Sequence, residues 1–343
     1  MNKKRVYING RFLTQPLTGV QRFAKEVTLR LSQADEYETT VLTPKNVNTN
    51  IKGNNLKVKR IGVFNGYLWE QIDLPLFLFF LKSPLLINLA NLAPVFYFNK
   101  LFTLHDTAYL DTPQSFNWRF KFAYKLLVPL LLISSKKILT VSEFSKSRII
   151  RNYKFVSPNS IKVIFNGSNF RLEKYNNQKK KKIILSVASH DKRKNTALLV
   201  SAFNLFNKKG LYRLILVGKQ GKAFKRMETN EYINVEYRDN VSDRDLEELY
   251  LSCDLCVNLS SYEGFGLPVL EALTLGAKVL CSDIEVFREL YGDNVFFTKI
   301  TDPSIVSSSI NRALSSNSLP ALDINKYSWR KTADNLSLII KKL

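Results

Sequence analysis

Short apolar runs alternate with stretches of helical periodicity along the whole chain, and this alternation limits the possible folds more than any other feature. Runs such as 6–8 and 183–187 have strand character, and each is followed after a polar turn by apolar residues at helix-like spacing. Such strands pair in parallel, because each helix carries the chain back to the starting edge of the sheet. The strands expected in this α/β fold are 6–8, 39–42, 57–61, 85–89, 100–104, 138–141, 161–165, 183–187, 212–217, 233–236, 255–259 and 278–281.

A polar stretch at 171–182 divides this series in two. It ends in four consecutive lysines, Lys179 to Lys182, and a second strand and helix series begins directly after them. A chain of 343 residues is long enough for two domains of ordinary size. We therefore expect a first domain at 1–171, a second domain at 172–325 and a separate amphipathic helix at 326–343.

Positive charge is concentrated in the first half of the chain. The formal net charge is +22; residues 1–171 carry 25 Lys and Arg against 9 Asp and Glu, and the remainder carries 26 against 20. A basic surface attracts nucleic acid, an anionic membrane or a phosphorylated substrate. Nucleic acid is the weakest of these partners, because the chain has no recognisable nucleic-acid-binding motif. The segment 117–127 interleaves aromatic and basic residues, which fits either an interfacial helix or a core helix with solvated lysines.

The composition is otherwise that of an ordinary soluble protein, with 45% hydrophobic and 23% charged residues. Three cysteines cannot form a disulfide framework, and they indicate buried thiols in a reducing compartment. Polar residues and prolines interrupt the apolar region 72–98, and the run 126–133 is too short to cross a bilayer. We expect neither a secretory signal nor a transmembrane helix.

The stretch Ser261 to Leu273, SYEGFGLPVLEAL, places two carboxylates around a glycine-rich turn. An apolar strand precedes it and apolar residues at helical spacing follow Pro268, so the stretch predicts a strand, a tight turn and a helix. Pro268 fits the first helical position, which puts Glu271 in the first turn. With no His or Cys nearby, Glu263 and Glu271 are interpreted as acceptors for sugar hydroxyls rather than as metal ligands. The alternative is that Glu271 only complements the helix dipole and the glycines only form the turn.

A candidate anion site follows the first strand of the second half, in the segment 189–195, SHDKRKN. Its cations should lie at the carboxyl edge of the sheet, where open α/β sheets bind ligands. Arg193 and Lys194 could hold a diphosphate and offset the charge that grows when a bond to a phosphate oxygen breaks. Standing alone, this motif could be a solvated basic loop, but Glu263 and Glu271 follow a later strand of the same domain.

These motifs together resemble the retaining glycosyltransferases with the GT-B fold, in particular family 4, the glycosyl transferases group 1. SYEGFGLPVLEAL matches that family's signature of two glutamates separated by seven residues. Seven further matches follow in order along almost the full length, at 17–23, 105–106, 140–145, 163–167, 191–195, 216–219 and 327–329.

The resemblance implies two Rossmann-like domains that face each other across a cleft, with a nucleotide-sugar donor held mainly by the second. It implies that Glu271 accepts hydrogen bonds from the donor ribose, that Arg193 and Lys194 bind the diphosphate, and that Glu263 contacts the donor sugar. The backbone of Gly264, Phe265, Gly266 and Leu267 would approach the sugar and phosphate closely.

In the first domain, the resemblance implies that Gly19 lets a loop come near the diphosphate and the acceptor. His105 matches a family histidine near the transferred sugar, where it could stabilise an oxocarbenium-like transition state, although a lone histidine at a strand end is more often structural. His190 is expected to be an ordinary loop residue. The helix after Trp329 is expected to cross back to the first domain.

The implied reaction retains the anomeric configuration by front-face attack, with the leaving diphosphate oxygen helping to take the acceptor proton. The resemblance implies that Arg193, Lys194 and helix termini stabilise the leaving group instead of a metal, so we expect neither a metal nor another cofactor. The expected function is transfer of a hexose or deoxyhexose to a lipid-linked glycan, such as a polyprenyl-diphosphate acceptor, in bacterial surface polysaccharide synthesis. The enzyme would be cytoplasmic and bound to the anionic inner face of the plasma membrane. A soluble sucrose- or trehalose-type synthase and a non-catalytic sugar-nucleotide-binding protein are the alternatives.

Overall fold

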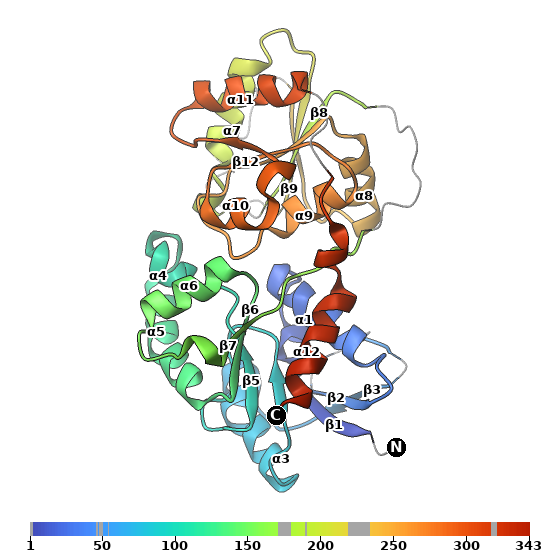
Figure 1. The fold of residues 1–343 in the computed structure, drawn as a ribbon, viewed down its shortest axis with the longest axis vertical. Helices are drawn as coiled ribbons and strands as arrows, with labels where there is room; N and C mark the ends of the chain where they lie inside the picture. Colours follow the sequence, from blue (N-terminus) through green and yellow to red (C-terminus); the bar gives the residue numbers. More distant parts are fainter. Residues whose placement is uncertain are drawn as a thin grey trace. The chain divides into compact units, whose positions relative to one another are not determined.

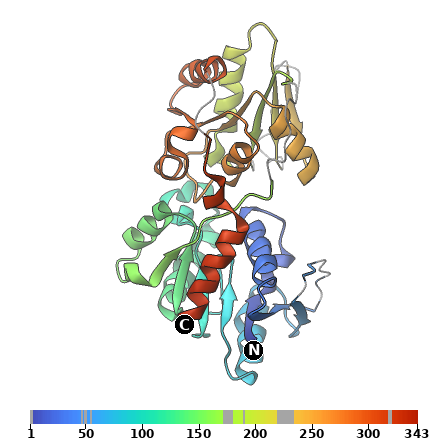
Figure 2. The ribbon, with the colours of Figure 1, turned by 45° about the vertical axis from the view of Figure 1, so that its right-hand side comes forward.

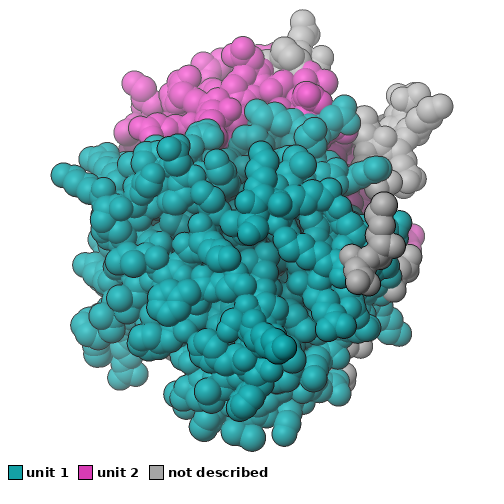
Figure 3. Space-filling view, turned by 60° about the horizontal axis from the view of Figure 1, so that its bottom comes forward, with its two compact units in different colours: residues 1–167, 325–343 teal, residues 168–324 magenta. Residues whose placement is uncertain are grey.

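The computed structural model describes residues 3–45, 47, 51–53, 55–170, 180–188, 191–218, 234–316 and 321–343. The chain forms two compact units, which Figure 3 distinguishes by colour. Unit 1 comprises residues 1–167 and 325–343, and unit 2 comprises residues 168–324. Each unit is described by itself below.

Unit 1 is built on a seven-stranded parallel sheet with the strand order β3-β2-β1-β4-β5-β6-β7 (Figure 1). Apolar side chains of the strands pack under the helices; Phe102, for example, lies in one cluster with Val128 and Leu131. The strands are β1 Lys4–Asn9, β2 Tyr37–Thr43, β3 Leu56–Arg60, β4 Leu86–Asn88, β5 Lys100–Thr103, β6 Lys137–Thr140 and β7 Ile161–Val163. The helices are α1 Gly19–Leu31, α2 Gly66–Leu68, α3 Leu74–Phe80, α4 Ala108–Asp111, α5 Trp118–Ser134, α6 Glu143–Asn152 and α12 Trp329–Lys341, and a π-helical turn, η2 Trp69–Asp73, joins α2 to α3.

Unit 2 repeats this architecture with a six-stranded parallel sheet in the order β10-β9-β8-β11-β12-β13. Side chains of α7 and α11 join those of the strands in its main core cluster. The strands are β8 Ile183–Val187, β9 Arg213–Val217, β10 Val235–Arg238, β11 Leu255–Asn258, β12 Val279–Ser282 and β13 Phe296–Thr298. The helices are α7 Thr196–Phe206, α8 Asp243–Ser252, α9 Leu267–Thr274, α10 Glu285–Tyr291 and α11 Pro303–Ser315.

The C-terminal helix α12 belongs to unit 1, where it lies beside α1 in both ribbon views (Figures 1 and 2). Trp329 at its start packs edge-on against Phe23 of α1, with 6.0 Å between the ring centres. Further along, the Ser337 hydroxyl lies 3.0 Å from the hydroxyl of the buried Tyr37. The expected return of this helix to the first domain is therefore confirmed.

The parallel α/β class predicted from the sequence is also confirmed, and each expected strand overlaps an observed one. The sequence analysis did not assign α3, β13 or α11. The units change at 167/168 and 324/325, whereas the sequence predicted boundaries at 171/172 and 325/326. Among the described residues, no helix combines the length and the apolar character that crossing a membrane requires.

Lysines near the amino ends of strands bind the carbonyl groups that end several helices. The ammonium group of Lys100 donates to the carbonyl of Ser134, at the end of α5, over 3.2 Å. Lys180, Lys278 and Lys4 do the same for α8, α11 and α12 through Cys253, Ser316 and Ile340. A cation at this place satisfies carbonyls that have no partner within the helix and complements the helix dipole.

We expect Gly167→Ala to lower the free energy of unfolding by about 1–3 kcal/mol, the usual cost of overpacking. A β-carbon on Gly167 would lie 2.1 Å from the backbone nitrogen of Trp329 and would push α12 away from the segment 164–167. Urea denaturation measures the effect. Lys331→Ala is the matched control, because this side chain is exposed on the same helix; equal midpoints for the two variants would contradict the prediction.

Candidate functional site

The candidate site of unit 2 lies where the direction of its sheet connections reverses. The chain leaves β8 toward β9 and leaves β11 toward β12, while β8 and β11 are neighbours in the sheet. The carboxyl ends of two such strands frame the crevice in which open α/β sheets bind ligands. The segments that follow them, 191–195 and 259–266, are the two motifs that the sequence predicted to act together.

Lys194 and Glu263 form an ion pair that joins these two segments. The ammonium group of Lys194 donates to Oε1 of Glu263, which also accepts a 2.8 Å hydrogen bond from the Ser260 hydroxyl. Both side chains of the pair are 14% exposed, so they are largely shielded but can be reached from solvent. The residues that the sequence assigned to phosphate and to sugar are thus direct partners, which sequence reasoning did not predict.

Arg193 is held in place by Asp191, two residues before it. Nε and Nη2 of Arg193 donate to Oδ2 of Asp191 over 3.0 and 2.6 Å, and the backbone N–H of Arg193 donates to Oδ1 over 3.0 Å. Burial would raise the pKa of Asp191, but these hydrogen bonds outweigh it and keep the pKa below its ordinary value. The carbonyl of Arg193 accepts the N–H of Ser261 over 2.7 Å, which fastens the first segment to the second.

The glycine turn 264–266 is shaped by α10. Gly266 has φ +84°, and a β-carbon there would lie 2.4 Å from the Phe287 ring, so both the backbone conformation and the packing require glycine. The Tyr291 hydroxyl lies 3.1 and 3.2 Å from the carbonyls of Phe265 and Gly266. The Phe265 side chain is buried and packs edge-on against Tyr291, so any ligand contact here is left to the backbone.

Helix α9 begins one residue earlier than the sequence predicted. Leu267 is its first residue and Pro268 its second, which makes Glu271 the fifth residue and places it beyond the first turn. The prediction that Glu271 lies in the first turn is therefore wrong. Leu267 itself is half-buried at the helix start.

Glu271 is buried against α8. Its Oε2 accepts a hydrogen bond from the Tyr250 hydroxyl over 3.2 Å, and 5% of the residue is exposed. Burial, together with the neighbouring Glu271 carboxylate, raises the pKa of Tyr250 well above its ordinary value, so Tyr250 stays a donor. Tyr250 gave no signal in the sequence, because it precedes Glu271 by 21 residues on another helix.

The two remaining predicted site residues, Gly19 and His105, lie in unit 1. Gly19 is exposed at the first position of α1. His105 follows β5, and its Nε2 lies 3.0 Å from the carbonyl of Leu89. A carbonyl only accepts, so Nε2 carries the proton and Nδ1 is the acceptor of the ring. Burial lowers the pKa of His105 to about 4, which makes the imidazole neutral at pH 7.

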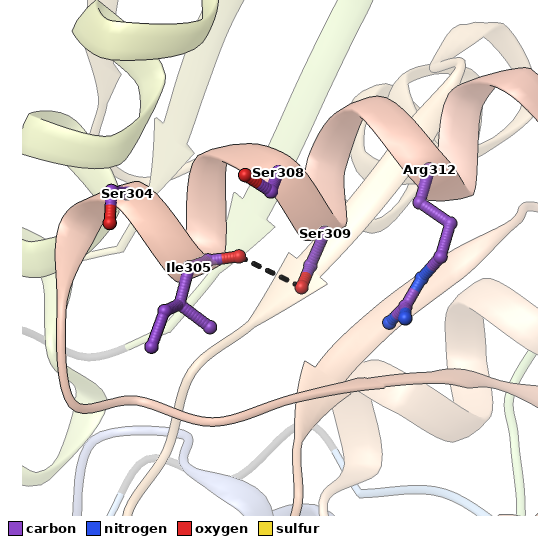
Figure 4. A pocket seen from close by; sticks show the side chains of 5 residues that line it. All are labelled: Ser304, Ile305, Ser308, Ser309 and Arg312. Atoms are coloured by element: carbon purple, nitrogen blue, oxygen red, sulfur yellow. Dashed lines mark hydrogen bonds between the residues drawn. The ribbon is translucent and has the colours of Figure 1, made fainter.

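Outside the motifs, the described residues offer a surface pocket but no metal-binding cluster. A shallow pocket along α11 is lined by Ser304, Ile305, Ser308, Ser309 and Arg312 (Figure 4). Ser309 and Arg312 there bind backbone carbonyls, and the pocket contains none of the predicted residues. No group of three His, Cys, Asp or Glu side chains within the described ranges could hold a metal ion. Ser189, His190 and Lys219, which belong to the sequence motifs, lie outside the described residues.

Comparison with known proteins links this site to one class of enzymes. Residues 168–329 match the family model of the glycosyl transferases group 1. O-antigen chain mannosyltransferase B of Escherichia coli is 31% identical over 207 residues, which are 54% of this chain and 54% of that protein. O-antigen chain mannosyltransferase RfbU of Salmonella typhimurium is 27% identical over 251 residues, 71% of this chain and 68% of the relative. The chain thus spans about half the length of the first relative.

The fold has close counterparts among solved structures. Sucrose-phosphate synthase from Thermosynechococcus elongatus superposes with a TM-score of 0.73 at 16% identity, over 99% of both chains. At this identity the likeness concerns the fold alone. The GT-B fold expected from the sequence is therefore confirmed, and the sequence matches support a glycosyltransferase.

We expect one of the two histidines of this chain to titrate with an apparent pKa of about 4, because burial disfavours the charged His105 ring. NMR of imidazole-labelled protein measures both rings, and His105→Gln should remove the low-pKa signal.

The unfolded state would bind more protons than the folded state between pH 6.5 and 4. As the pH falls through that window, His105 should therefore lower the free energy of unfolding by roughly 3 kcal/mol. A His105 pKa near 6.5 would contradict the prediction.

Proposed function

We propose that the protein is a retaining glycosyltransferase of family 4, which moves a hexose or deoxyhexose from a nucleoside diphosphate to a glycan of a bacterial surface polysaccharide. The observation that carries the proposal is the ion pair of Lys194 and Glu263 between the ends of β8 and β11. It combines a cation for phosphate with a carboxylate for hydroxyls at a ligand-binding edge, within the segment that matches the family model. Since both named relatives are mannosyltransferases, GDP-mannose is the first donor to test.

In this proposal, Arg193 and Lys194 bind the diphosphate, Glu263 accepts hydroxyls of the donor sugar and Glu271 accepts those of the ribose. The pairing of Lys194 with Glu263 makes two of these roles interdependent. When the ammonium group turns to the diphosphate, the carboxylate is released to accept sugar hydroxyls, so one rearrangement prepares both contacts. Tyr250 positions Glu271, and Asp191 positions Arg193.

The proposed chemistry breaks the bond between the anomeric carbon and the diphosphate oxygen and forms a bond to the acceptor hydroxyl on the same face. The leaving oxygen takes the acceptor proton. Negative charge grows on the diphosphate as the bond breaks, and fixed cations lower the energy of that state. Neutral His105 would contribute by accepting a hydrogen bond from a sugar hydroxyl at Nδ1, not by carrying a positive charge, because its pKa is about 4. Gly19 would supply backbone near the diphosphate.

We also propose that unit 1 binds an anionic membrane surface, at the cytoplasmic face of the plasma membrane, where a lipid-linked acceptor would be presented. Helix α5 supports this, because an exposed apolar stripe runs along its length of about 25 Å, beside the exposed Arg119 and Lys125. Trp118, Phe122 and Ile133 are 69%, 67% and 69% exposed, and Leu126 and Leu130 lie between them on the same face.

The charge around this face suits an anionic surface. From Thr112 to Ser142 the chain has no acidic residue and five basic ones: Arg119, Lys121, Lys125, Lys136 and Lys137. Carboxylates would be repelled by anionic lipid, and lysines beside an apolar stripe are attracted to it. The inward face of α5 packs in the core through Val128 and Leu131, as the core-helix alternative requires, and the interfacial role of its exposed face is part of the proposal.

We expect Lys194→Ala to lower kcat/KM by about 100-fold or more, the usual effect of removing a group that stabilises developing charge. Arg193→Ala and Glu271→Ala should abolish turnover as well. Release of the nucleoside diphosphate from a panel of nucleotide sugars is the measurement. Lys192→Ala is the matched control, because Lys192 is exposed on the same turn. Unchanged transfer by Lys194→Ala would reject the site assignment.

We expect the protein to float with vesicles that contain phosphatidylglycerol and to be released by salt. Replacing both Trp118 and Phe122 by Ala should weaken binding at least about tenfold, because two large apolar side chains no longer enter the bilayer surface. Leu211→Ala, which removes a 54% exposed apolar side chain in unit 2, should have no effect. Absence of flotation, or equal flotation of the double variant, would count against this membrane surface.

A further inference from the structure

Unit 1 has a reversal point of its own. Gly19, at the start of the helix after β1, and His105, whose ring contacts the Leu89 carbonyl just after β4, belong to the same edge of the sheet. The chain leaves β1 toward β2 and, after a crossover, leaves β4 toward β5, while β1 and β4 are neighbours in the sheet. Asn9 is the last residue of β1, and Asn88 is the last residue of β4. By the same rule that locates the site of unit 2, a ligand is expected where these two strands end.

A buried polar network connects the two strand ends. The Asn9 amide donates to Oε1 of Glu70 over 2.7 Å and to Oδ1 of Asn88 over 2.8 Å. Arg11 donates to Oε2 of Glu70 over 2.8 Å, and 1% of Glu70 is exposed. Glu70 lies in the π-helical turn η2, a distortion that is frequent at functional sites. Because the desolvation of a buried ion pair usually cancels its attraction, stability alone is a poor reason for this network.

Tyr67 covers the network and presents one ring face to solvent. The guanidinium carbon of Arg11 lies 4.0 Å from the ring centre of Tyr67, so one face of the ring rests on the cation. The residue is 54% exposed, although it touches a group that is nine-tenths buried. Nε of Arg11 is buried and has no hydrogen-bond partner among the described residues. Arg11 thus supports one face of the aromatic ring, which is the arrangement of a platform.

The chemistry of this platform suits a sugar ring better than a phosphate. The charges of Arg11 and Glu70 cancel within the network, so no net positive charge is left to attract an anion. A pyranose ring has an apolar C–H face, which can stack on the outer face of Tyr67, and a rim of hydroxyls, which can reach polar groups.

We propose that Tyr67, positioned by Arg11 and Glu70, is the subsite that holds a pyranose residue of the glycan acceptor. The inference rests on the proposed glycosyl transfer and adds to it the chemical class of the second ligand, a neutral pyranoside, and its place at the ends of β1 and β4. Tyr67 makes the contact, and Arg11 and Glu70 are positioning residues.

Saturation-transfer NMR on the full chain tests the proposal with three probes: methyl α-mannopyranoside, methyl α-galactopyranoside and methyl N-acetyl-α-glucosaminide. Wild-type protein should transfer saturation to the C–H face of at least one of them. Tyr67→Ala should raise its Kd about tenfold, an effect at the upper end of those measured for aromatic contacts. Tyr67→Phe keeps the ring face and should stay within about twofold of wild type. Phe155→Ala is the matched control, because Phe155 is 55% exposed and precedes β7. It therefore lies at the amino ends of the strands, away from the carboxyl ends of β1 and β4.

Calorimetry with GDP and UDP separates this proposal from the glycosyl transfer on which it rests. Wild type and Tyr67→Ala should bind the nucleotides equally well. If neither nucleotide binds wild type, the donor site is rejected, and the pyranoside measurements still decide whether the subsite exists. The subsite is overturned if no glycoside binds wild type, if Tyr67→Ala binds it equally well, or if inorganic pyrophosphate displaces it. The last result would indicate an anion site. Melting curves check that each variant is folded. If Tyr67→Ala does not fold, pyranoside binding by Tyr67→Phe still tests the proposal.

Discussion

The ion pair of Lys194 and Glu263 depends on the parallel order of the strands, and the rest of the candidate site depends on this pair. Because β8 and β11 run in the same direction side by side, the segments that follow them emerge at one edge. The ion pair joins those segments through side chains, and the hydrogen bond from Ser261 to the Arg193 carbonyl joins them through the backbone. These contacts hold Arg193, Lys194, Glu263 and the adjoining glycine turn together before any ligand binds.

Local patterns in the sequence predicted what is local in the structure. Short apolar runs were enough for β1 to β12 but not for β13. The glycine, proline and glutamate pattern at 261–273 was enough for a turn and a helix, with an error of one residue at Pro268. Partners that are distant along the chain could not be predicted. Tyr250 reaches Glu271 from α8, and Arg11 meets Glu70 across 59 residues, because the tertiary fold and no local pattern brings them together.

The net charge of +22 is a weaker guide to partners than it first suggested. Lys100 is fully buried, and Lys4, Lys180 and Lys278 also donate to carbonyls at helix ends, so part of the excess stabilises the fold. The distribution of charge therefore indicates an anionic partner better than the net charge does. No carboxylate lies between Asp111 and Glu143, a segment that includes the exposed apolar stripe of α5.

The two reversal points of this chain differ in a way that matches two kinds of ligand. At the ends of β8 and β11, four charged side chains are partly exposed, and Lys194 can exchange Glu263 for a phosphate group. At the ends of β1 and β4, the charges of Arg11 and Glu70 are buried and matched, and an aromatic face is what reaches solvent. An enzyme that joins an anionic donor to a neutral sugar needs one site of each kind. Under the two proposals, the same strand geometry supplies both sites, and the side chains that follow the strands decide which ligand each one accepts.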